Sequence, residues 1–233
     1  MKWLAPLLDL LFPRRCAFCR VLLDDEQLPN LLCRSCEQTV LNPDECCSYC
    51  GYPLAATGEG YCPLCSEHSY AFYAACAVSL FRGELRKAIL RFKYGGKSEL
   101  AVPFGQLMAR QIRKCGWPDL AAVVPIPLHP QKLRERGYDQ ALLLAQVLGK
   151  ELGLPVLKLL VRRQPTVSQT TLSAAQRWQN VAAAFAFNRQ SGLPARVLLV
   201  DDLLTTGATA HFAAEVLLQA GVKEVYLAVI AHS

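Results

Sequence analysis

The sequence contains no uninterrupted apolar run of about 18 residues, the length that a helix needs to cross a lipid bilayer. We therefore expect no membrane span. Charged residues make up only 19% of the 233 positions and hydrophobic residues 52%. This balance excludes a mainly disordered chain and allows a buried core, in one large domain or two modest ones.

A clear export signal is also missing from residues 1–16. Their apolar stretch is broken by Pro6 and Asp9, and no small-residue cleavage site follows it. Leucines recur there at helical spacing, which predicts an amphipathic helix over residues 1–15: Leu4, Leu7, Leu8 and Leu11. A signal peptide is the alternative. We expect a cytoplasmic protein whose cysteines stay reduced and bind metal.

Acidic residues are scarce in the larger, C-terminal part of the chain. Residues 1–66 carry 5 Lys/Arg and 8 Asp/Glu, for a net charge of −3. Residues 67–233 carry 20 Lys/Arg and 11 Asp/Glu, for a net charge of +9. An excess of positive charge favours an anionic ligand for residues 67–233.

Nine of the eleven cysteines lie in residues 1–66, where eight of them form four C-x-x-C knuckles. The first two knuckles are separated by 13 residues and the last two by 11. A tight C-x-x-C turn aims two sulfurs at one ion, and a second knuckle completes a tetrahedral thiolate site that suits Zn²⁺. The pattern predicts a double zinc ribbon over residues 16–66 with these ligands: Cys16, Cys19, Cys33, Cys36, Cys47, Cys50, Cys62 and Cys65.

The pairing of knuckles and the role of the metal have alternatives. Sequential pairing is our prediction, and interleaved pairing is the alternative. A set closed by four cysteines is typical of a structural site, whereas replacement of one ligand by His68 or a redox disulfide would change its role. Cys46, Cys76 and Cys115 remain outside the knuckles, and simple packing explains the last two.

Basic residues dominate residues 82–136, with 12 Lys/Arg against 4 Asp/Glu. We expect a strand over 76–81 and helices over 83–92 and 98–115, the second capped by Ser98. Basic side chains interleaved with aromatic ones can follow a phosphate backbone and stack on bases. The candidate DNA contacts are Arg86, Arg91, Lys93, Tyr94 and Lys97. The alternative is a solvated helix face with aromatic side chains in the core.

A second basic segment follows the short apolar strand expected over 121–124. Pro125 and Pro127 end this strand, and a loop then precedes a helix expected over 139–152. The loop carries His129, Lys132, Arg134 and Arg136. The carboxyl end of a strand in an α/β sheet is where ligands bind, so these side chains suit phosphate, although His129 could equally cap or pack.

The segment from Val197 to Thr209, VLLVDDLLTTGAT, carries the most specific signal. It predicts a strand over 197–200, a turn over 204–209 and a helix over 210–220, followed by a strand over 224–230. The turn and helix N-terminus form an anion cradle, and Gly207 allows close approach of a phosphate. Asp201 and Asp202 suit two neighbouring sugar hydroxyls. The pattern indicates a ribose 5-phosphate.

This segment resembles the signature of type I phosphoribosyltransferases, four apolar residues, two acidic residues and a Thr-Gly loop. The resemblance implies an α/β fold with a mainly parallel, Rossmann-like sheet and helices on both faces, over residues 67–233. It implies that Asp201 and Asp202 contact the ribose hydroxyls of phosphoribosyl pyrophosphate and that Mg²⁺ accompanies this ligand. The 5-phosphate would lie against Thr205, Thr206, Gly207, Ala208 and Thr209. The pyrophosphate would lie by Pro127, Leu128 and the basic side chains that follow.

Across nearly the whole chain, the sequence resembles the ComF family of competence-associated proteins. The resemblance is carried by Phe92–Gly95, Pro125–Gln140, Gln169–Val181 and the Asp-Asp segment. It implies a double zinc ribbon joined to a phosphoribosyltransferase domain. It also implies handling of single-stranded DNA in natural transformation or DNA utilisation, with DNA-uptake or recombination proteins as partners. The chain departs from the family at Lys132, where Arg is usual, and at Tyr138-Asp139, where Phe-Asn is usual.

The polar segment over 162–180 resembles the flexible loop that closes over the substrate in this superfamily, with Gln169, Arg177 and Asn180 as its candidate site residues. An ordinary exposed connection is the alternative. Two classes of function follow. One is a phosphoribosyltransferase whose acceptor and catalytic residues the sequence does not identify. The other is a catalytically inactive module that binds nucleic acid or protein and uses the fold as a ligand sensor.

Overall fold

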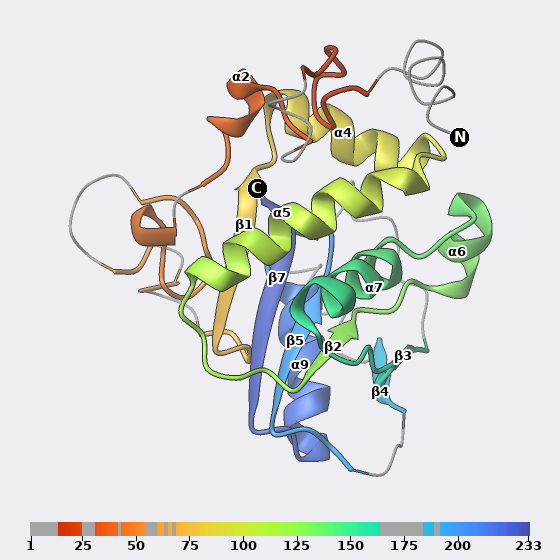
Figure 1. Ribbon diagram of the computed structural model, residues 1–233. Coiled ribbons are helices and arrows are strands. Elements are labelled where there is room, and N and C mark those ends of the chain that lie inside the picture. Colours follow the sequence, from red (N-terminus) through yellow and green to blue (C-terminus); the bar gives the residue numbers. More distant parts are fainter. Residues whose placement is uncertain are drawn as a thin grey trace.

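A parallel sheet forms the centre of the molecule. The computed structural model describes residues 14–24, 31–41, 43–54, 60–62, 65–66, 69–163, 184–188 and 192–233. Figure 1 shows the sheet, whose strand order is β1 (Ala74–Leu80), β7 (Glu224–His232), β5 (Arg196–Val200) and β2 (Ala122–Pro125). The short strand β6 (Leu203–Leu204) also pairs with β7, and all these pairings are parallel. Strand residues are apolar on both sides, as expected for a parallel sheet covered on both faces.

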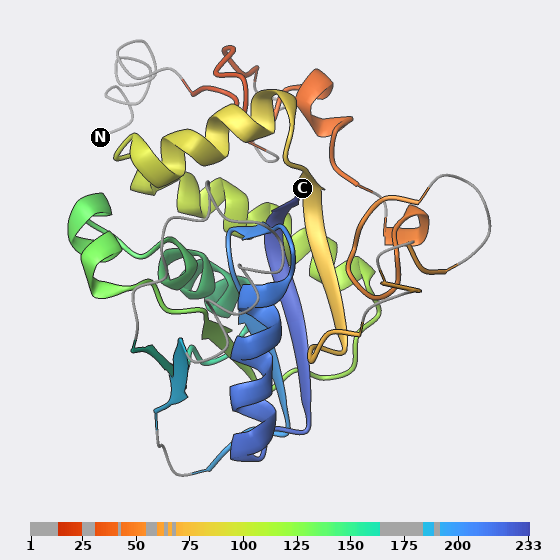
Figure 2. The same ribbon diagram turned by 180° about the vertical axis from the view of Figure 1, so that it is seen from behind.

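Helices cover both faces of this sheet. On one face lie α4 (Gly83–Tyr94), α5 (Ala101–Lys114) and α7 (Gln140–Leu152). The other face is covered by α9 (Ala208–Ala220), which lies in front of the sheet in Figure 2. Alternate residues along each strand feed the two cores, so that Val123 packs with the first face and Val124 with the second. The expected α/β fold with helices on both faces is confirmed.

Part of the cysteine-rich region lies along the outer edge of β1, whereas residues 14–24 lie beside α4 (Figure 1). The region includes the short helix α2 (Arg34–Glu37) and the 3₁₀ turn η2 (Pro43–Glu45). The N–H of Leu41 donates to the carbonyl of Val78 at 2.9 Å, and the N–H of Ala75 donates to the carbonyl of Tyr49 at 2.7 Å. These bonds pair part of the edge of β1 with the cysteine-rich segments.

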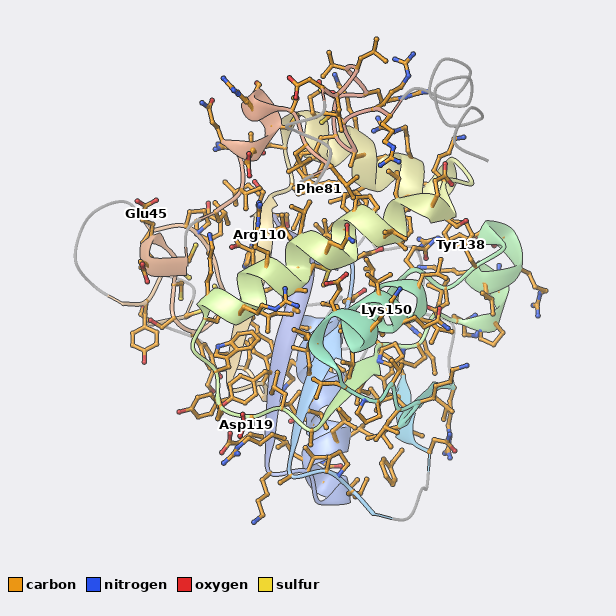
Figure 3. The ribbon with its side chains drawn as sticks, viewed as in Figure 1. Glu45, Phe81, Arg110, Asp119, Tyr138 and Lys150 are labelled. Carbon is orange, nitrogen blue, oxygen red and sulfur yellow. The ribbon has the colours of Figure 1, made fainter. Side chains whose placement is uncertain are left out.

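Each half of the cysteine-rich region also joins one of the two cores. Cys16 and Phe18 are buried with α4 and α5, whereas Cys50 and Cys62 are buried with α9 and its face of the sheet. The Arg110 guanidinium, labelled in Figure 3, lies 3.1 Å from the Glu37 carboxylate and joins α5 to α2. The described part of the cysteine-rich region therefore packs against the α/β fold and shares its hydrophobic cores.

Two local expectations were wrong, and one pair of strands was not expected. Ser98 begins a 3₁₀ turn, η3 (Ser98–Leu100), and α5 begins only at Ala101 without a side-chain cap. The expected basic loop is a helix, α6 (Pro130–Arg136), which begins with a proline at a position where its missing N–H costs nothing. The antiparallel pair of β3 (Leu160–Arg162) and β4 (Phe185–Phe187) was not expected at all.

The expected N-terminal helix falls almost entirely outside the described residues. Of residues 1–15, only Arg14 and Arg15 are described, and Arg15 forms an isolated bridge with Leu22. Within the described part of the chain, no helix combines the length and the apolar character needed to cross a membrane.

Candidate functional site

The eight knuckle cysteines form two separate four-sulfur clusters. One cluster holds Cys16, Cys19, Cys33 and Cys36, and the other holds Cys47, Cys50, Cys62 and Cys65. Within each, the ligand atoms all lie within 4.8 Å of one another. Sequential pairing is therefore confirmed and interleaved pairing is wrong. Four converging thiolates are the donor set of a structural Zn²⁺ site, so the chain has two four-cysteine zinc sites.

The cysteines outside the knuckles take no part in these clusters. Cys47, not the adjacent Cys46, belongs to the second cluster, as the C-x-x-C spacing predicts. Cys46, Cys76 and Cys115 border a cavity of about 200 Å³ between the second cluster and α5. His68 lies outside the described residues.

A second feature is a cleft of about 410 Å³ at the carboxyl end of the parallel sheet. Asp201 and Asp202 enter it between β5 and β6, and the turn before α9 contributes Thr205, Gly207 and Thr209. Pro127 and Leu128 follow β2, and the facing helix α6 contributes Lys132 and Arg136. The cleft thus brings together segments that lie far apart in the sequence.

The two carboxylates of the cleft are in different surroundings. Asp202 is buried, and its Oδ1 lies 2.8 Å from Nζ of Lys93 on α4. Asp201 accepts the N–H of Asp202 at 2.8 Å. Burial, followed by the negative charge of Asp202, raises the pKa of Asp201 to about 7, although Lys93 opposes this shift. Asp201 can therefore take up or release a proton near neutral pH.

Positive side chains surround these carboxylates. Burial, followed by the charges of Arg162 and Arg136, lowers the pKa of Lys132. Arg162 on β3 also lines the cleft, and its burial lowers its pKa against the opposing effect of Asp201. The guanidinium of Arg136 lies 5.0 Å from the ring centre of the exposed Tyr94 at the rim. Several positive side chains that line one cleft favour a bound anion.

The Thr-Gly turn has a shape that only glycine permits. Gly207 has φ of +77° and stands immediately before α9, and a Cβ atom there would overlap the ring of Tyr70. The N-terminus of α9 opens on the cleft beside Thr205 and Thr209, and such helix ends bind anions. Thr206 and Ala208 are not among the residues that line the cleft.

Tyr138 and Asp139, where the sequence departs from the family motif, lie next to each other between α6 and α7, and of the two only Asp139 lines the cleft. The two carboxylate oxygens of Asp139 accept separate N–H groups, from Leu142 at 3.0 Å and from Leu128 at 3.1 Å. Asp139 therefore caps α7 and holds the turn after β2 at the same time. The Tyr138 hydroxyl donates to the carbonyl of Phe92 at 2.5 Å, where α6, α7 and the end of α4 meet (Figure 3).

Apart from Tyr94 at the rim, the remaining site residues that the structure describes lie outside the cleft. His129 Nδ1 accepts the N–H of Gln131 and caps α6, so of its three expected roles it performs capping, and neither it nor the exposed Arg134 lines the cleft. Arg91 donates to the carbonyls of Ala17 and Phe18 at 3.2 and 2.8 Å. Among the candidate DNA contacts, Arg86, Tyr94 and Lys97 are exposed. Gln169, Arg177 and Asn180 lie outside the described residues.

Three cleft residues were missed or misassigned from the sequence. Lys93 was expected to contact DNA, but its side chain is turned into the cleft toward Asp202. Arg162 was read only as the start of a polar loop. The sequence places Asp139 at the start of a helix and marks it as a departure from the family motif, but predicts no role for it in the cleft. Their placement depends on contacts between distant segments, and no local pattern reports such contacts.

Comparison with known proteins identifies the relatives of this chain. A family model described as a double zinc ribbon domain matches residues 7–66. Competence protein F of Haemophilus influenzae is 30% identical over 223 residues, which cover 92% of this chain and 95% of that protein. The chain belongs to the ComF family.

Other relatives also match most of the chain. Competence protein ComFC of Bacillus subtilis is 29% identical, with 78% of this chain and 82% of that protein covered. The DNA utilization protein YhgH of Salmonella typhi is 28% identical, with 82% and 85% covered. Among solved structures, adenine phosphoribosyltransferase from Leishmania donovani is 17% identical and covers 61% of this chain and 56% of its own, with a TM-score of 0.38.

Proposed function

We propose that this ComF-family protein binds phosphoribosyl pyrophosphate with Mg²⁺ in the cleft and supports DNA uptake or utilisation by handling single-stranded DNA in the cytoplasm. One observation above all supports this choice of ligand. Asp201, the Thr-Gly turn before α9 and the cations of α6 all line the same cleft. The names of the relatives, which refer to competence and DNA utilization, support the biological role.

Each part of the ligand has a complementary part of the cleft. The 5-phosphate accepts from the turn at 205–209 and the N-terminus of α9. The ribose hydroxyls face Asp201 and Asp202. The pyrophosphate lies between the turn at Pro127–Leu128 and the side chains of Lys132 and Arg136. These positions assign the opposite ends of the ligand to two helices, α9 and α6.

The cleft also fits a magnesium ion, because carboxylate and phosphate oxygens are the ligands that Mg²⁺ prefers. Asp201 and Asp202 are the residues that would face it. When bound, Mg²⁺ neutralises charge on the departing pyrophosphate. The cations Lys132, Arg136 and Arg162 add to this stabilisation from the protein side, in a preorganised arrangement.

With an acceptor present, the reaction is displacement at the anomeric carbon. The acceptor forms a bond to this carbon while the bond to the pyrophosphate oxygen breaks, and pyrophosphate leaves with the electron pair. Without an acceptor, the same cleft acts as a ligand sensor. The sensor is the second candidate, because the Lys93–Asp202 ion pair already engages one of the two carboxylates that the reaction would use.

Calorimetric titration with phosphoribosyl pyrophosphate and Mg²⁺ tests the ligand. A matched pair of variants comes from α6, because Lys132 lines the cleft and Arg134 is exposed outside it. Lys132→Ala should weaken binding about tenfold or more, and Arg134→Ala should leave the affinity within about twofold. The double variant Asp201→Ala/Asp202→Ala should abolish binding. A folded, zinc-loaded wild type that binds no ligand would refute the proposed site.

Binding of single-stranded DNA is tested by its salt dependence. Arg86→Ala/Lys97→Ala should lower the slope of log affinity against log salt by about 1.4, since each lost phosphate contact on a single strand removes roughly 0.7. Lys150→Ala/Lys223→Ala removes the same charge from other exposed positions and should leave this slope unchanged. Equal effects of the two double variants would show general electrostatic attraction without a defined DNA surface.

A further inference from the structure

Tyr49 connects the second four-cysteine cluster to the segment before β1. It lies inside the knuckle, between the ligands Cys47 and Cys50. Its hydroxyl accepts the N–H of Tyr70 at 2.8 Å and donates to the carbonyl of the same residue. One side chain of the knuckle therefore holds both polar backbone groups of Tyr70, which fixes the position of that residue relative to the cluster.

Tyr70 in turn supports the Thr-Gly turn of the cleft. Its ring stacks on Phe72, with ring centres 4.9 Å apart and planes 9° from parallel. The same ring occupies the space that a side chain at Gly207 would need. The Tyr70 hydroxyl is 3.4 Å from the carbonyl of Thr206, to which it donates. The turn thus rests on an aromatic ring that Tyr49 holds in place.

The residue after Tyr70 reaches the first turn of α9. The N–H of Ala71 donates to Nδ1 of His211 at 3.1 Å, and the other ring nitrogen of His211 lies 3.4 Å from Glu215. Residues 70 and 71 therefore contact the Thr-Gly turn on one side, at Thr206 and Gly207, and the helix that follows it on the other. Both structures that the proposed phosphate site needs are supported by one short segment.

We infer that the second zinc site positions the phosphate-binding turn through Tyr49 and Tyr70, so that these tyrosines are positioning residues for the ligand phosphate. This inference rests on the proposed function for its ligand, although the coupling itself is a property of the free protein. Coupling between two sites is reciprocal, so an intact second cluster strengthens ligand binding and bound ligand stabilises that cluster.

Hydrogen exchange of the free, zinc-loaded protein tests the coupling without any ligand. Tyr49→Phe keeps the ring and removes the hydroxyl that holds Tyr70. It should leave two zinc ions per chain and speed amide exchange over residues 205–211 about threefold or more. Tyr61→Phe is the matched control, because Tyr61 lies in the same cysteine-rich segment with its side chain exposed, and it should leave this exchange unchanged.

A ligand titration completes the test. Tyr49→Phe should weaken binding of phosphoribosyl pyrophosphate about fivefold or more, and Tyr61→Phe should not. Should Tyr49→Phe fail to fold, Tyr70→Phe, which removes only the hydroxyl that donates to Thr206, takes its place with the same expectations. Unchanged exchange over 205–211 would overturn the coupling, whatever the ligand does. Faster exchange in a protein whose wild type binds no ligand would uphold the coupling and refute the proposed function.

Discussion

Nζ of Lys93 lies 2.8 Å from Oδ1 of Asp202, and both side chains are largely buried. The burial of Lys93 lowers its pKa, the charge of Asp202 raises it, and the net shift is upward. The ammonium group therefore stays charged at neutral pH. This ion pair joins α4 to the end of β5 and places a positive charge beside both carboxylates of the cleft.

Loss of the Lys93 charge should destabilise the fold. Lys93→Met leaves a buried carboxylate without its partner, which typically costs about 3–5 kcal/mol. Lys87→Met on the same helix breaks only an exposed pair with Glu84 and should cost under about 1 kcal/mol. Urea unfolding of the zinc-loaded variants measures both. The double variant Lys93→Met/Asp202→Asn should recover part of the loss, and equal costs for the two single variants would contradict this role of the ion pair.

Asp201 should make the stability of the free protein depend on pH. In the folded protein its pKa is raised to about 7 from an ordinary value of 3.8, so the folded state retains a proton that the unfolded state has lost. Stability therefore falls as pH rises from about 4 to 7. Asp201→Asn should melt higher than the wild type at about pH 8, and the difference should shrink toward about pH 4. Thermal melts without Mg²⁺ measure this, and parallel pH curves for the two proteins would refute it.

Gly207 should tolerate no side chain, for two separable reasons. Gly207→Ala meets both an unfavourable φ of +77° and the ring of Tyr70, whereas Gly192→Ala meets the same φ of +77° with no atom within 4 Å. The unfavourable backbone conformation alone should lower the free energy of unfolding by about 1 kcal/mol, and Gly192→Ala measures this contribution by itself. Gly207→Ala should lose more stability than this and should lose ligand affinity as well. Calorimetry and urea unfolding check both, and equal losses in the two variants would show that Tyr70 does not constrain the turn.

The two zinc sites should load independently. Cys36→Ser in the first cluster and Cys62→Ser in the second should each lower the zinc content from two ions to one per chain, because the clusters share no ligand. Cys115→Ser should leave two ions bound. Elemental analysis of the purified proteins gives the count. Loss of both ions from either knuckle variant would show that the clusters depend on one another.

Features encoded by contiguous residues could be predicted from the sequence. The four knuckles lie close together in the chain, and two residues between cysteines suffice to aim both sulfurs at one ion. The strand, acidic pair and Thr-Gly turn also follow one another directly, from Val197 to Thr209. For these segments local geometry determines the structure, so pattern and spacing carry most of the information.

Features that depend on tertiary contacts could not be predicted. The role of Lys93 follows from a partner that is remote in the sequence, and within its own helix it looks like one more basic side chain. None of the residues of α6 is buried, because this helix lies over the cleft. Its sequence therefore has no apolar stripe at helical spacing, and the pattern predicts a loop. The strands β3 and β4 have three residues each and pair across a long intervening segment, which leaves no hairpin signal.

The cysteine-rich segments have a consequence for solubility, because they pair with the outer edge of β1. A strand edge whose N–H and carbonyl groups face solvent is a template for pairing with another chain. The bonds from Leu41 to Val78 and from Ala75 to Tyr49 come from segments whose folding depends on metal. Loss of zinc would therefore open an apolar strand edge to self-association. Metal availability in the cell would then decide how much of the protein stays dispersed and how much aggregates.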